Sequence, residues 1–362
     1  MNYYNNDTIK ESFILVGVEL PGEKNIDASL DELERLIDTA GAEVVGRIFQ
    51  KREYVSPATY VGKGKIDEIK ALLALTDATG IVCDDELSPA QFKNLEDELD
   101  VKVMDRTLVI LDIFAQHATT SEGKIQVEMA QLKYRATRLA GFGNSLSRLG
   151  GGIGTRGPGE KKIEVDRRRI HDRISQLKKE LSRVERVRET NRKRREDNRQ
   201  KVAAIVGYTN AGKSTLLNRL TAANVLSENK LFATLDPTTR ALTYPTGKKL
   251  LMTDTVGFIR KLPHNLVEAF KSTLEEAKYA DIIIHVVDSS NPDYERQMET
   301  VYSTLESLGV SGKPIFTLFN KADCVEGENV FKDPIADKVF MISAKSGTGI
   351  AELREFLEEF AK

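Results

Sequence analysis

The residues best suited to chemistry form a glycine-rich run at positions 207–214, which reads GYTNAGKS and matches the pattern G-x-x-x-x-G-K-[ST]. An apolar stretch typical of a buried strand precedes the run, and a helix-like pattern follows it. In that context the motif turns backbone N–H groups inward around phosphates. Lys213 is expected to reach the β- and γ-phosphates, and the Ser214 hydroxyl to ligate Mg²⁺. The alternative, a chance match in a glycine-rich turn, conflicts with the flanking strand and helix.

A second motif selects the base. Residues 320–323 read NKAD and follow an apolar stretch at 315–319, which places them at the carboxyl edge of a predicted sheet, where ligands bind. The Asp323 carboxylate would accept two hydrogen bonds, from guanine N1–H and the exocyclic amine, and adenine offers no such pair. Asn320 is expected to brace the loop and reach N7, and the Lys321 stem to cover the base.

Two further segments complete a nucleotide switch. Asp254 ends another predicted strand and is expected to hold Mg²⁺ through water, while the Gly257 N–H senses the γ-phosphate. Thr234 lies between the helix of the phosphate loop and the next strand, and it is expected to ligate Mg²⁺ only when GTP is bound. Thr238 and Thr239 are competing candidates. Such a pair of segments orders with GTP and relaxes on hydrolysis.

Three residues bear on the rate of hydrolysis. Phe258 follows Gly257, at the place where Ras-like GTPases carry a glutamine that orients the attacking water. A phenyl ring neither donates nor accepts, so slow intrinsic hydrolysis and a stimulating partner are expected. Asn210 either binds K⁺ in place of an arginine finger, as in several GTPases with this motif, or only stabilises its loop. Tyr208 is either part of the switch or a packing residue.

The expected GTP- and GDP-binding residues come from five segments, and the Ala344 N–H is expected to donate to guanine O6. They are Gly207, Tyr208, Thr209, Asn210, Ala211, Gly212, Lys213, Ser214, Thr215, Phe232, Ala233, Thr234, Leu235, Asp236, Asp254, Thr255, Val256, Gly257, Asn320, Lys321, Ala322, Asp323, Ser343, Ala344 and Lys345. Of these, Lys213, Ser214, Thr234 and Gly257 are the expected catalytic residues. The expected Mg²⁺ ligands are Ser214, Thr234 and, through water, Asp254.

The elements that position these residues are α/β. Strand and helix patterns alternate over residues 12–117, which predicts a small parallel sheet. Ser88 and Pro89 fit the N-cap and first position of a helix that reaches Leu99. The alternation resumes at Val202 and predicts a doubly wound α/β domain around the glycine-rich run.

The middle of the chain is helical. Its apolar residues recur with heptad spacing in two stretches, at Ile125, Met129, Leu132, Ala136 and Leu139 and again at Ile163, Ile170, Ile174, Leu177, Leu181 and Val184. Eight glycines in residues 141–159 separate the stretches. The pattern predicts an antiparallel helical hairpin whose second helix, residues 163–188, extends about 39 Å as a projecting arm.

Positive charge gathers in this region, although the whole chain carries a net charge of −2. Residues 160–201 hold 17 lysines and arginines against 9 acidic residues. One interpretation is a solvated helix with ion pairs at i, i+4, and the other is a basic surface for a polyanion. The two cysteines, Cys83 and Cys324, have no metal-ligand spacing and fit reduced thiols. No apolar run of about 18 residues occurs, so no integral membrane segment is expected.

These patterns predict an N-terminal α/β domain at 1–118, a helical hairpin arm with a glycine-rich basic tip at 119–191, a linker at 192–200 and a C-terminal doubly wound P-loop GTPase domain at 201–362.

The motifs resemble those of the HflX GTPases, in the Obg–HflX branch of translational GTPases, over nearly the whole chain. The resemblance rests on six blocks besides the phosphate loop: YVGKGK at 60–65, DRT at 105–107, QVEMAQL at 126–132, GGIGTRGPGE at 151–160, FATLDPTTR at 232–240 and DTVGFI at 254–259.

The resemblance implies a cytoplasmic factor that in its GTP form binds the large ribosomal subunit and its rRNA and splits stalled ribosomes, notably under stress. It implies a monomer that binds no DNA, with peripheral membrane association left open. In the family the arm reaches toward the peptidyl transferase centre, and Arg148, Arg156, Lys161 and Lys162 would supply phosphate contacts here. Many members carry a further C-terminal domain whose contacts cannot be assumed for a sequence ending at Lys362.

Two other functions stay open at this point. A GTPase that assists ribosome assembly or RNA remodelling would prefer immature subunits or free RNA. A membrane- or protein-binding adaptor would use the arm as a coiled-coil surface, and the basic tip argues against it. A dinucleotide site at 152–157, which matches G-x-G-x-x-G, lacks the strand that such a site requires.

Overall fold

The computed structural model of the chain describes residues 10–22, 25–146, 158–197, 200–221, 230–263, 266, 276–325 and 330–361. It divides into two compact units. Unit 1 comprises Met1–Gln116 with Met129–Gln176, and unit 2 comprises His117–Glu128 with Leu177–Lys362.

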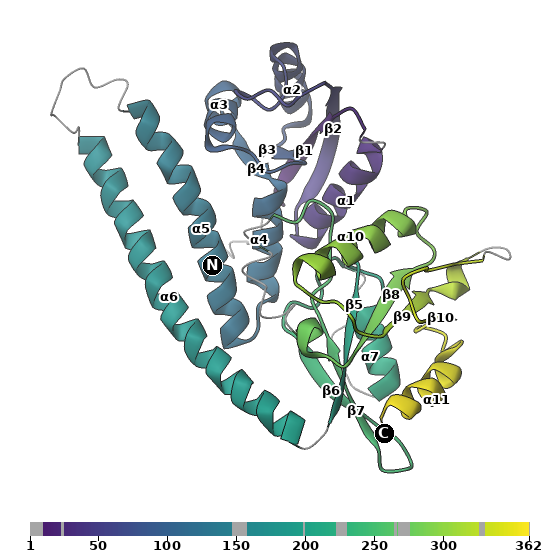
Figure 1. Ribbon diagram of the computed structural model, residues 1–362. Helices are drawn as coiled ribbons and strands as arrows, with labels where there is room; N and C mark the ends of the chain where they lie inside the picture. Colours follow the sequence, from purple (N-terminus) through teal and green to yellow (C-terminus); the bar gives the residue numbers. More distant parts are fainter. Residues whose placement is uncertain are drawn as a thin grey trace, which may run out of the picture. The chain divides into compact units, whose positions relative to one another are not determined.

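Unit 1 contains a parallel sheet with strand order β2-β1-β3-β4 (Figure 1). Strands and helices alternate along the chain, so the predicted small parallel sheet is confirmed. The elements are β1 (Ser12–Glu19), α1 (Ile26–Thr39), β2 (Glu43–Lys51), α2 (Lys63–Thr76), β3 (Gly80–Cys83), α3 (Pro89–Leu99), β4 (Lys102–Asp105) and α4 (Arg106–His117).

Helix α3 begins as its sequence predicts. The Ser88 hydroxyl accepts a hydrogen bond from the Gln91 N–H at 3.3 Å, and the Gln91 side chain accepts one from the Ser88 N–H at 2.9 Å. Pro89 occupies the first turn, where its missing N–H costs nothing. The loop before α3 is thereby held at the carboxyl edge of the sheet.

Arg106 anchors the carboxyl end of β4. Its side chain is 1% exposed and pairs with Asp84 at 2.8 Å and Glu32 at 2.6 Å. Burial lowers the pKa of this guanidinium, but the two carboxylates outweigh burial and the net shift is upward. A buried charge is tolerated here because both partners are in hydrogen-bond contact.

Asp105 fastens α5 (Ser121–Leu146) to the same sheet edge. Its Oδ1 accepts a hydrogen bond from the Tyr134 hydroxyl at 2.7 Å, and its Oδ2 accepts one from Arg138 at 2.7 Å. Residues 129–176 therefore belong to the compact unit of the sheet. This part of the predicted arm at 119–191 thus shares a compact unit with the sheet of the predicted domain at 1–118, which the heptad pattern alone does not indicate because it contains no information about the second buried face of α5.

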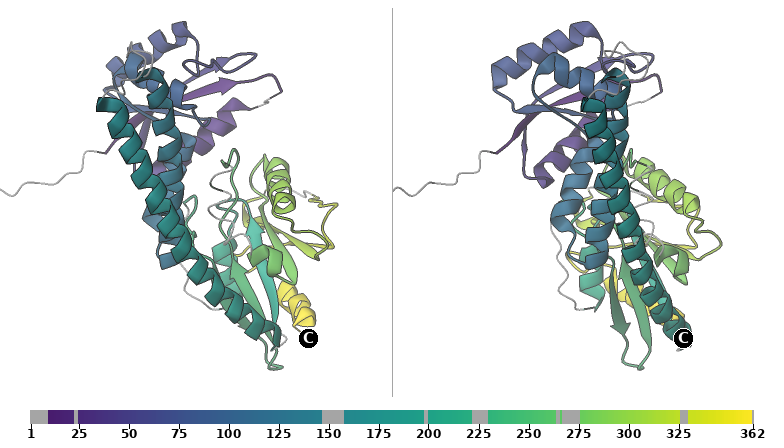
Figure 2. Two further views of the ribbon diagram at one scale, coloured as in Figure 1. Left: turned by 60° about the vertical axis from the view of Figure 1, so that its left-hand side comes forward. Right: turned by 90° about the vertical axis from the view of Figure 1, so that its left-hand side faces the viewer.

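Helix α6 spans Pro158–Asp197 and is longer than the predicted 163–188. Within unit 1, α5 and α6 lie side by side and run in opposite directions (Figures 1 and 2). Ile174 and Leu177 of the predicted seam are buried. Residues 192–197, which belong to the predicted linker at 192–200, continue the helix because no glycine or proline ends it there.

Unit 2 contains a six-stranded sheet with the order β10-β9-β8-β5-β7-β6. All its pairs are parallel except β6 with β7, and β6 is an edge strand that the sequence did not predict. The predicted doubly wound domain is otherwise confirmed. Its elements are β5 (Lys201–Gly207), α7 (Lys213–Thr221), β6 (Thr238–Thr243), β7 (Lys249–Asp254), β8 (Ile282–Asp288), α10 (Tyr294–Ser307), β9 (Ile315–Asn320), β10 (Lys338–Met341) and α11 (Ile350–Phe360).

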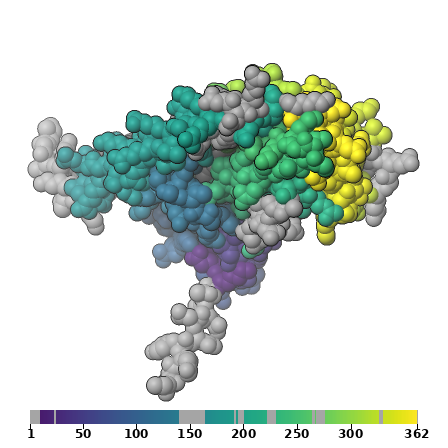
Figure 3. Space-filling view, turned by 90° about the horizontal axis from the view of Figure 1, so that it is seen from below, coloured from purple at the N-terminus to yellow at the C-terminus, as the bar shows by residue number. Residues whose placement is uncertain are grey.

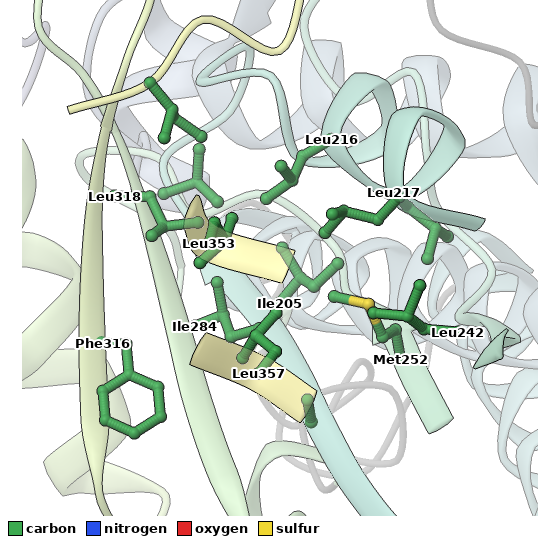
Figure 4. Packing of buried hydrophobic residues seen from close by; sticks show 14 of the residues in the cluster. Ile205, Leu216, Leu217, Leu242, Met252, Ile284, Phe316, Leu318, Leu353 and Leu357 are labelled. Atoms are coloured by element: carbon green, nitrogen blue, oxygen red, sulfur yellow. The ribbon is translucent and has the colours of Figure 1, made fainter. Parts of the chain in front are cut away.

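The core of this sheet packs α7 and α11 against one set of strand side chains. Leu216 and Leu217 of α7 and Leu353 and Leu357 of α11 meet Ile205 and other strand residues (Figure 4). Each of these side chains is fully buried, and such burial contributes about 1.5–3 kcal/mol per side chain. The outer side of α11, yellow in Figure 3, is at the surface. This packing holds the strand ends that carry the nucleotide motifs.

Some predicted features lie outside the described residues. They include most of the glycine-rich tip, Arg148 and Arg156, and the side chains of Lys161 and Lys162. In the part of the chain that the structure describes, no helix is long and apolar enough to cross a membrane.

His285 gives unit 2 a pH-dependent stability. Burial in β8 lowers the pKa of its imidazole to about 4, although Asp333 opposes the shift. An unfolded histidine titrates near pH 6.5, so stability is fully present above that pH and is lost as pH falls toward 4, by about 3 kcal/mol in total. Urea unfolding of the chain at pH 7, 6 and 5 measures this loss. The His285→Gln variant is expected to lack it between pH 6.5 and 5, and parallel profiles for the two proteins would contradict the prediction.

Candidate nucleotide-binding site

A pocket in unit 2 collects the residues predicted to bind phosphates. It is lined by the glycine-rich loop, by the segment before β6 and by one residue after β7. The lining residues are Thr209, Asn210, Gly212, Lys213, Ser214, Thr215, Lys230, Phe232, Ala233, Thr234 and Gly257. Three segments far apart in the sequence therefore meet at the N-terminus of α7, where the helix dipole favours an anion.

Lys213 is buried at the first position of α7. Its ammonium donates to the Tyr208 carbonyl at 2.8 Å. Burial lowers the pKa of Lys213 to about 8, and the Asp254 carboxylate opposes this shift. Phosphate oxygens beside the ammonium would favour its charged form, so the residue is suited to bind a polyphosphate.

Three oxygens converge beside Lys213 in a way that fits Mg²⁺. The Ser214 hydroxyl lies 2.6 Å from Asp254 Oδ2 and 2.7 Å from the Thr234 hydroxyl. Burial raises the pKa of Asp254, and among the described residues its Oδ1 has no hydrogen-bond partner. Oxygen ligands with a buried carboxylate are the set that Mg²⁺ prefers, and the ion would supply the missing partner.

The positions of the three candidate threonines favour Thr234 as the Mg²⁺ ligand. Thr238 and Thr239 belong to β6, where Thr239 contacts the Thr253 hydroxyl at 2.9 Å. Thr234 alone among the three lies beside Ser214. The Thr209 hydroxyl holds this segment by accepting the Phe232 N–H at 2.9 Å.

The segment after β7 is joined to the phosphate loop by backbone hydrogen bonds. The Thr209 N–H donates to the Phe258 carbonyl at 2.7 Å, and the Phe258 N–H donates to the Gly207 carbonyl at 3.1 Å. A Cβ on Gly257 would lie 2.7 Å from Thr209 Cα, so only glycine fits this approach. The Phe258 side chain is 1% exposed and turns away from solvent.

Tyr208 takes part in the same contact. The side chain is buried, and its hydroxyl accepts a hydrogen bond from the Arg260 N–H at 2.8 Å. Tyr208 therefore packs in the core and also contacts the segment after β7, and its part in a switch stays a prediction.

Asn320 connects the base-selecting loops to the phosphate loop. Its Nδ2 donates to the Ala211 carbonyl at 2.8 Å, and its Oδ1 accepts the Ala344 N–H at 2.9 Å. A Cβ on Gly212 would lie 2.2 Å from Asn320 Nδ2, which explains why glycine stands there. Asn320 braces the loops as expected. Because the Ala344 N–H donates to Asn320 here, its role toward guanine O6 stays a prediction.

Asp323 presents a carboxylate to solvent beside these loops. A hydrogen bond from the Ser343 side chain and the nearby Lys345 charge hold its pKa below the usual value. Lys321 has a left-handed backbone with φ of 65° and pairs with Asp288 at 2.6 Å. An exposed carboxylate is thus present where the sequence predicts the acceptor for guanine.

The structure places three residues differently from the sequence-based prediction. Lys230 lines the pocket, although the sequence analysis did not select it; a basic residue shortly before Thr234 was the available signal. Asp236, expected among the nucleotide-binding residues, instead directs its carboxylate to Thr119 and Thr120. Leu235 is buried and does not line the pocket.

The fold and the pocket define a P-loop GTP hydrolase. Residues 27–115, 117–195 and 202–321 match the family models "GTP-binding GTPase N-terminal", "GTP-binding GTPase Middle Region" and "50S ribosome-binding GTPase". A GTPase HflX of Lacrimispora saccharolytica is 63% identical over 350 residues, which cover 97% of this chain and 83% of that protein. The GTPase HflX of Escherichia coli is 42% identical, with 96% of this chain and 82% of that protein covered. The chain belongs to the HflX family of GTPases and hydrolyses GTP.

Solved structures agree with this assignment. A GTP-binding protein from the archaeon Sulfolobus solfataricus in complex with GDP is 27% identical, with a TM-score of 0.50 and coverage of 98% of this chain and 99% of that one. The complex of SsGBP with GDP has a TM-score of 0.52 at 28% identity, over 97% of this chain and 98% of that one. The nucleotide in both of these structures is GDP.

Proposed function

We propose that this GTPase is a cytoplasmic monomer that binds the large ribosomal subunit in its GTP form and splits stalled ribosomes, notably under stress. Hydrolysis, stimulated by the ribosome, then allows its release. The observation that carries the proposal is the match of residues 202–321 to a 50S ribosome-binding GTPase, within a chain that is similar to HflX proteins along 97% of its length.

Helix α6 offers a surface suited to RNA. Its exposed basic residues include Arg167, Arg168, Lys178, Lys179 and Arg183. Within the described part of α6, ion pairs join Arg169 to Asp166 at 3.8 Å and Lys193 to Glu189 at 3.4 Å. Many of the exposed cations thus belong to no such pair within the helix, which favours the polyanion interpretation of this charged region.

The residues of the site fit a GTP hydrolase that is slow by itself and is stimulated by a partner. Phe258 is buried and offers no group that could orient water. Lys213 would bind the phosphates, Ser214, Thr234 and Asp254 would hold Mg²⁺, and the Gly257 N–H would meet the γ-phosphate. The ion would neutralise charge that develops on the phosphate oxygens. Asn210 lines the same pocket, and comparing hydrolysis in K⁺ and Na⁺ buffers tests whether it binds K⁺.

Co-sedimentation with ribosomes and separated subunits tests the proposal. We expect association with the large subunit when a non-hydrolysable GTP analogue is bound and loss of most binding with GDP. We expect about a tenfold or larger increase in the single-turnover hydrolysis rate with ribosomes, since a partner must position the water. Raising salt from 50 to 200 mM should weaken binding steeply, because phosphate contacts release counterions.

Other outcomes are informative. Preference for immature subunits or free RNA would favour a role in ribosome assembly or RNA remodelling instead. Binding that does not depend on the nucleotide, or equal hydrolysis rates with and without ribosomes, would reject the proposed cycle.

A further inference from the structure

Asp236 makes a dense set of contacts that GTP binding by itself does not explain. Its Oδ2 accepts hydrogen bonds from the Thr119 N–H at 2.9 Å, the Thr119 hydroxyl at 2.7 Å and the Thr120 N–H at 2.8 Å, and its Oδ1 accepts the Thr120 hydroxyl at 2.5 Å. All three residues belong to unit 2. These hydrogen bonds hold the pKa of Asp236 below its usual value against the effect of burial.

The partners of Asp236 form the beginning of α5. Thr120 precedes the first helical residue, and its hydroxyl accepts the Gly123 N–H at 3.0 Å while its carbonyl accepts the Lys124 N–H at 3.0 Å. Asp236 therefore binds at a helix N-terminus, where a negative charge is favoured. The helix and the carboxylate stabilise each other.

Gly123 makes this contact possible. A Cβ at this position would lie 2.3 Å from Asp236 Oδ1, which is too close for two non-bonded atoms. In an ordinary helix, alanine at the same position would be more favourable than glycine by about 1 kcal/mol. The glycine therefore lowers the intrinsic helix propensity at a point where it makes room for the carboxylate.

Asp236 stands two residues after Thr234, whose hydroxyl lies 2.7 Å from that of Ser214. On the other side of Thr234, the Phe232 N–H is held by Thr209. The short segment that carries Thr234 is thus fixed at both ends, once to the phosphate loop and once to α5.

We propose that Asp236 is a positioning residue for GTP: its attachment to Thr119 and Thr120 places Thr234 at the Mg²⁺ site. The proposal rests on the proposed function of the site, in which Thr234 ligates Mg²⁺ only with the triphosphate, so that the attachment stabilises the GTP state relative to the GDP state. By the reciprocity of coupled binding, GTP also stabilises the first turn of α5.

The test uses the full chain and two variants that break the contact between Asp236 and the beginning of α5, one variant in each partner. Asp236→Ala removes the acceptor, and Gly123→Ala displaces it without changing any of the hydrogen-bonding side chains. Asn25→Ala is the matched control, because it removes a helix cap from α1, where the Asn25 side chain accepts the Ala28 N–H at 3.2 Å. Thermal unfolding of each variant checks that it is folded.

The measured quantities are the Kd values for GDP and for a non-hydrolysable GTP analogue, both with Mg²⁺. For each contact variant we expect about a tenfold loss of affinity for the analogue and a change within about twofold for GDP. The double variant should be no worse than either single one, because both remove the same contact. The control should change neither affinity.

Hydrogen exchange supplies an independent readout. In the wild-type chain, the Gly123 and Lys124 amides should exchange more slowly with the analogue than with GDP, and this difference should vanish in Asp236→Ala. Equal losses of both affinities, no change in either, or additive losses in the double variant would each overturn the proposal and leave Asp236 a purely structural cap.

Discussion

Replacing Asp323 by asparagine is expected to lower the affinity for GTP and GDP by about a thousandfold. The carboxylate is exposed, and Ser343 and Lys345 keep it ionised. Hydrogen bonds from guanine to an ionised acceptor are stronger than those to a neutral one, and a donor that faces a donor in the variant adds repulsion. We expect this loss because asparagine pairs with guanine less well than aspartate does, and not because the packing of the loop changes.

The measurement compares guanine and xanthine nucleotides by titration calorimetry. Xanthine carries a carbonyl in place of the exocyclic amine, so an asparagine amide can donate to it while accepting N1–H. We therefore expect Asp323→Asn to prefer xanthosine diphosphate over GDP. Asp67→Asn, which changes an exposed carboxylate of α2, is the control. If Asp323→Asn binds both nucleotides as the wild type does, the base is selected elsewhere.

Replacing Ser214 by alanine is expected to lower the single-turnover rate of GTP hydrolysis by about a hundredfold or more. The Ser214 hydroxyl is the centre of the oxygen cluster, at 2.6 Å from Asp254 and 2.7 Å from Thr234. Without it the remaining oxygens hold Mg²⁺ less well, and removal of one well-placed electrostatic contact at a reacting phosphate costs about this much.

Measuring the hydrolysis rate at increasing Mg²⁺ concentration distinguishes weaker binding of the ion from a misplaced ion as the cause of this loss. Partial recovery at high Mg²⁺ would show weakened ion binding, and a persistent loss would show that the ion is misplaced. Ser303→Ala is the control, since that hydroxyl donates to the Thr300 carbonyl of its own helix α10 at 3.1 Å. A Ser214→Ala rate within about threefold of the wild type would exclude Ser214 from the ion site.

Local sequence determined much of the candidate site. The phosphate loop, the segment of Asp254 and the loop of Asn320 were predicted because each is a short pattern at a strand end, and backbone geometry at such ends is set by neighbouring residues. The parallel sheets followed from alternating strand and helix patterns for the same reason. The start of α3 was also predicted, since Ser88 and Pro89 fit the N-cap and the first helical position by residue type alone.

Tertiary structure decided how these segments meet. Three threonines could serve at the ion site by sequence, and only the pairing of Thr238 and Thr239 into β6 leaves Thr234 beside Ser214. The contact between Asp236 and Thr120 spans 116 positions and belongs to no sequence period. The second buried face of α5 depends on Asp105 in another element. Local sequence patterns reflect how a residue affects its own helix or strand. Contacts between residues that are distant in the sequence form only when the chain packs, so local patterns do not predict them.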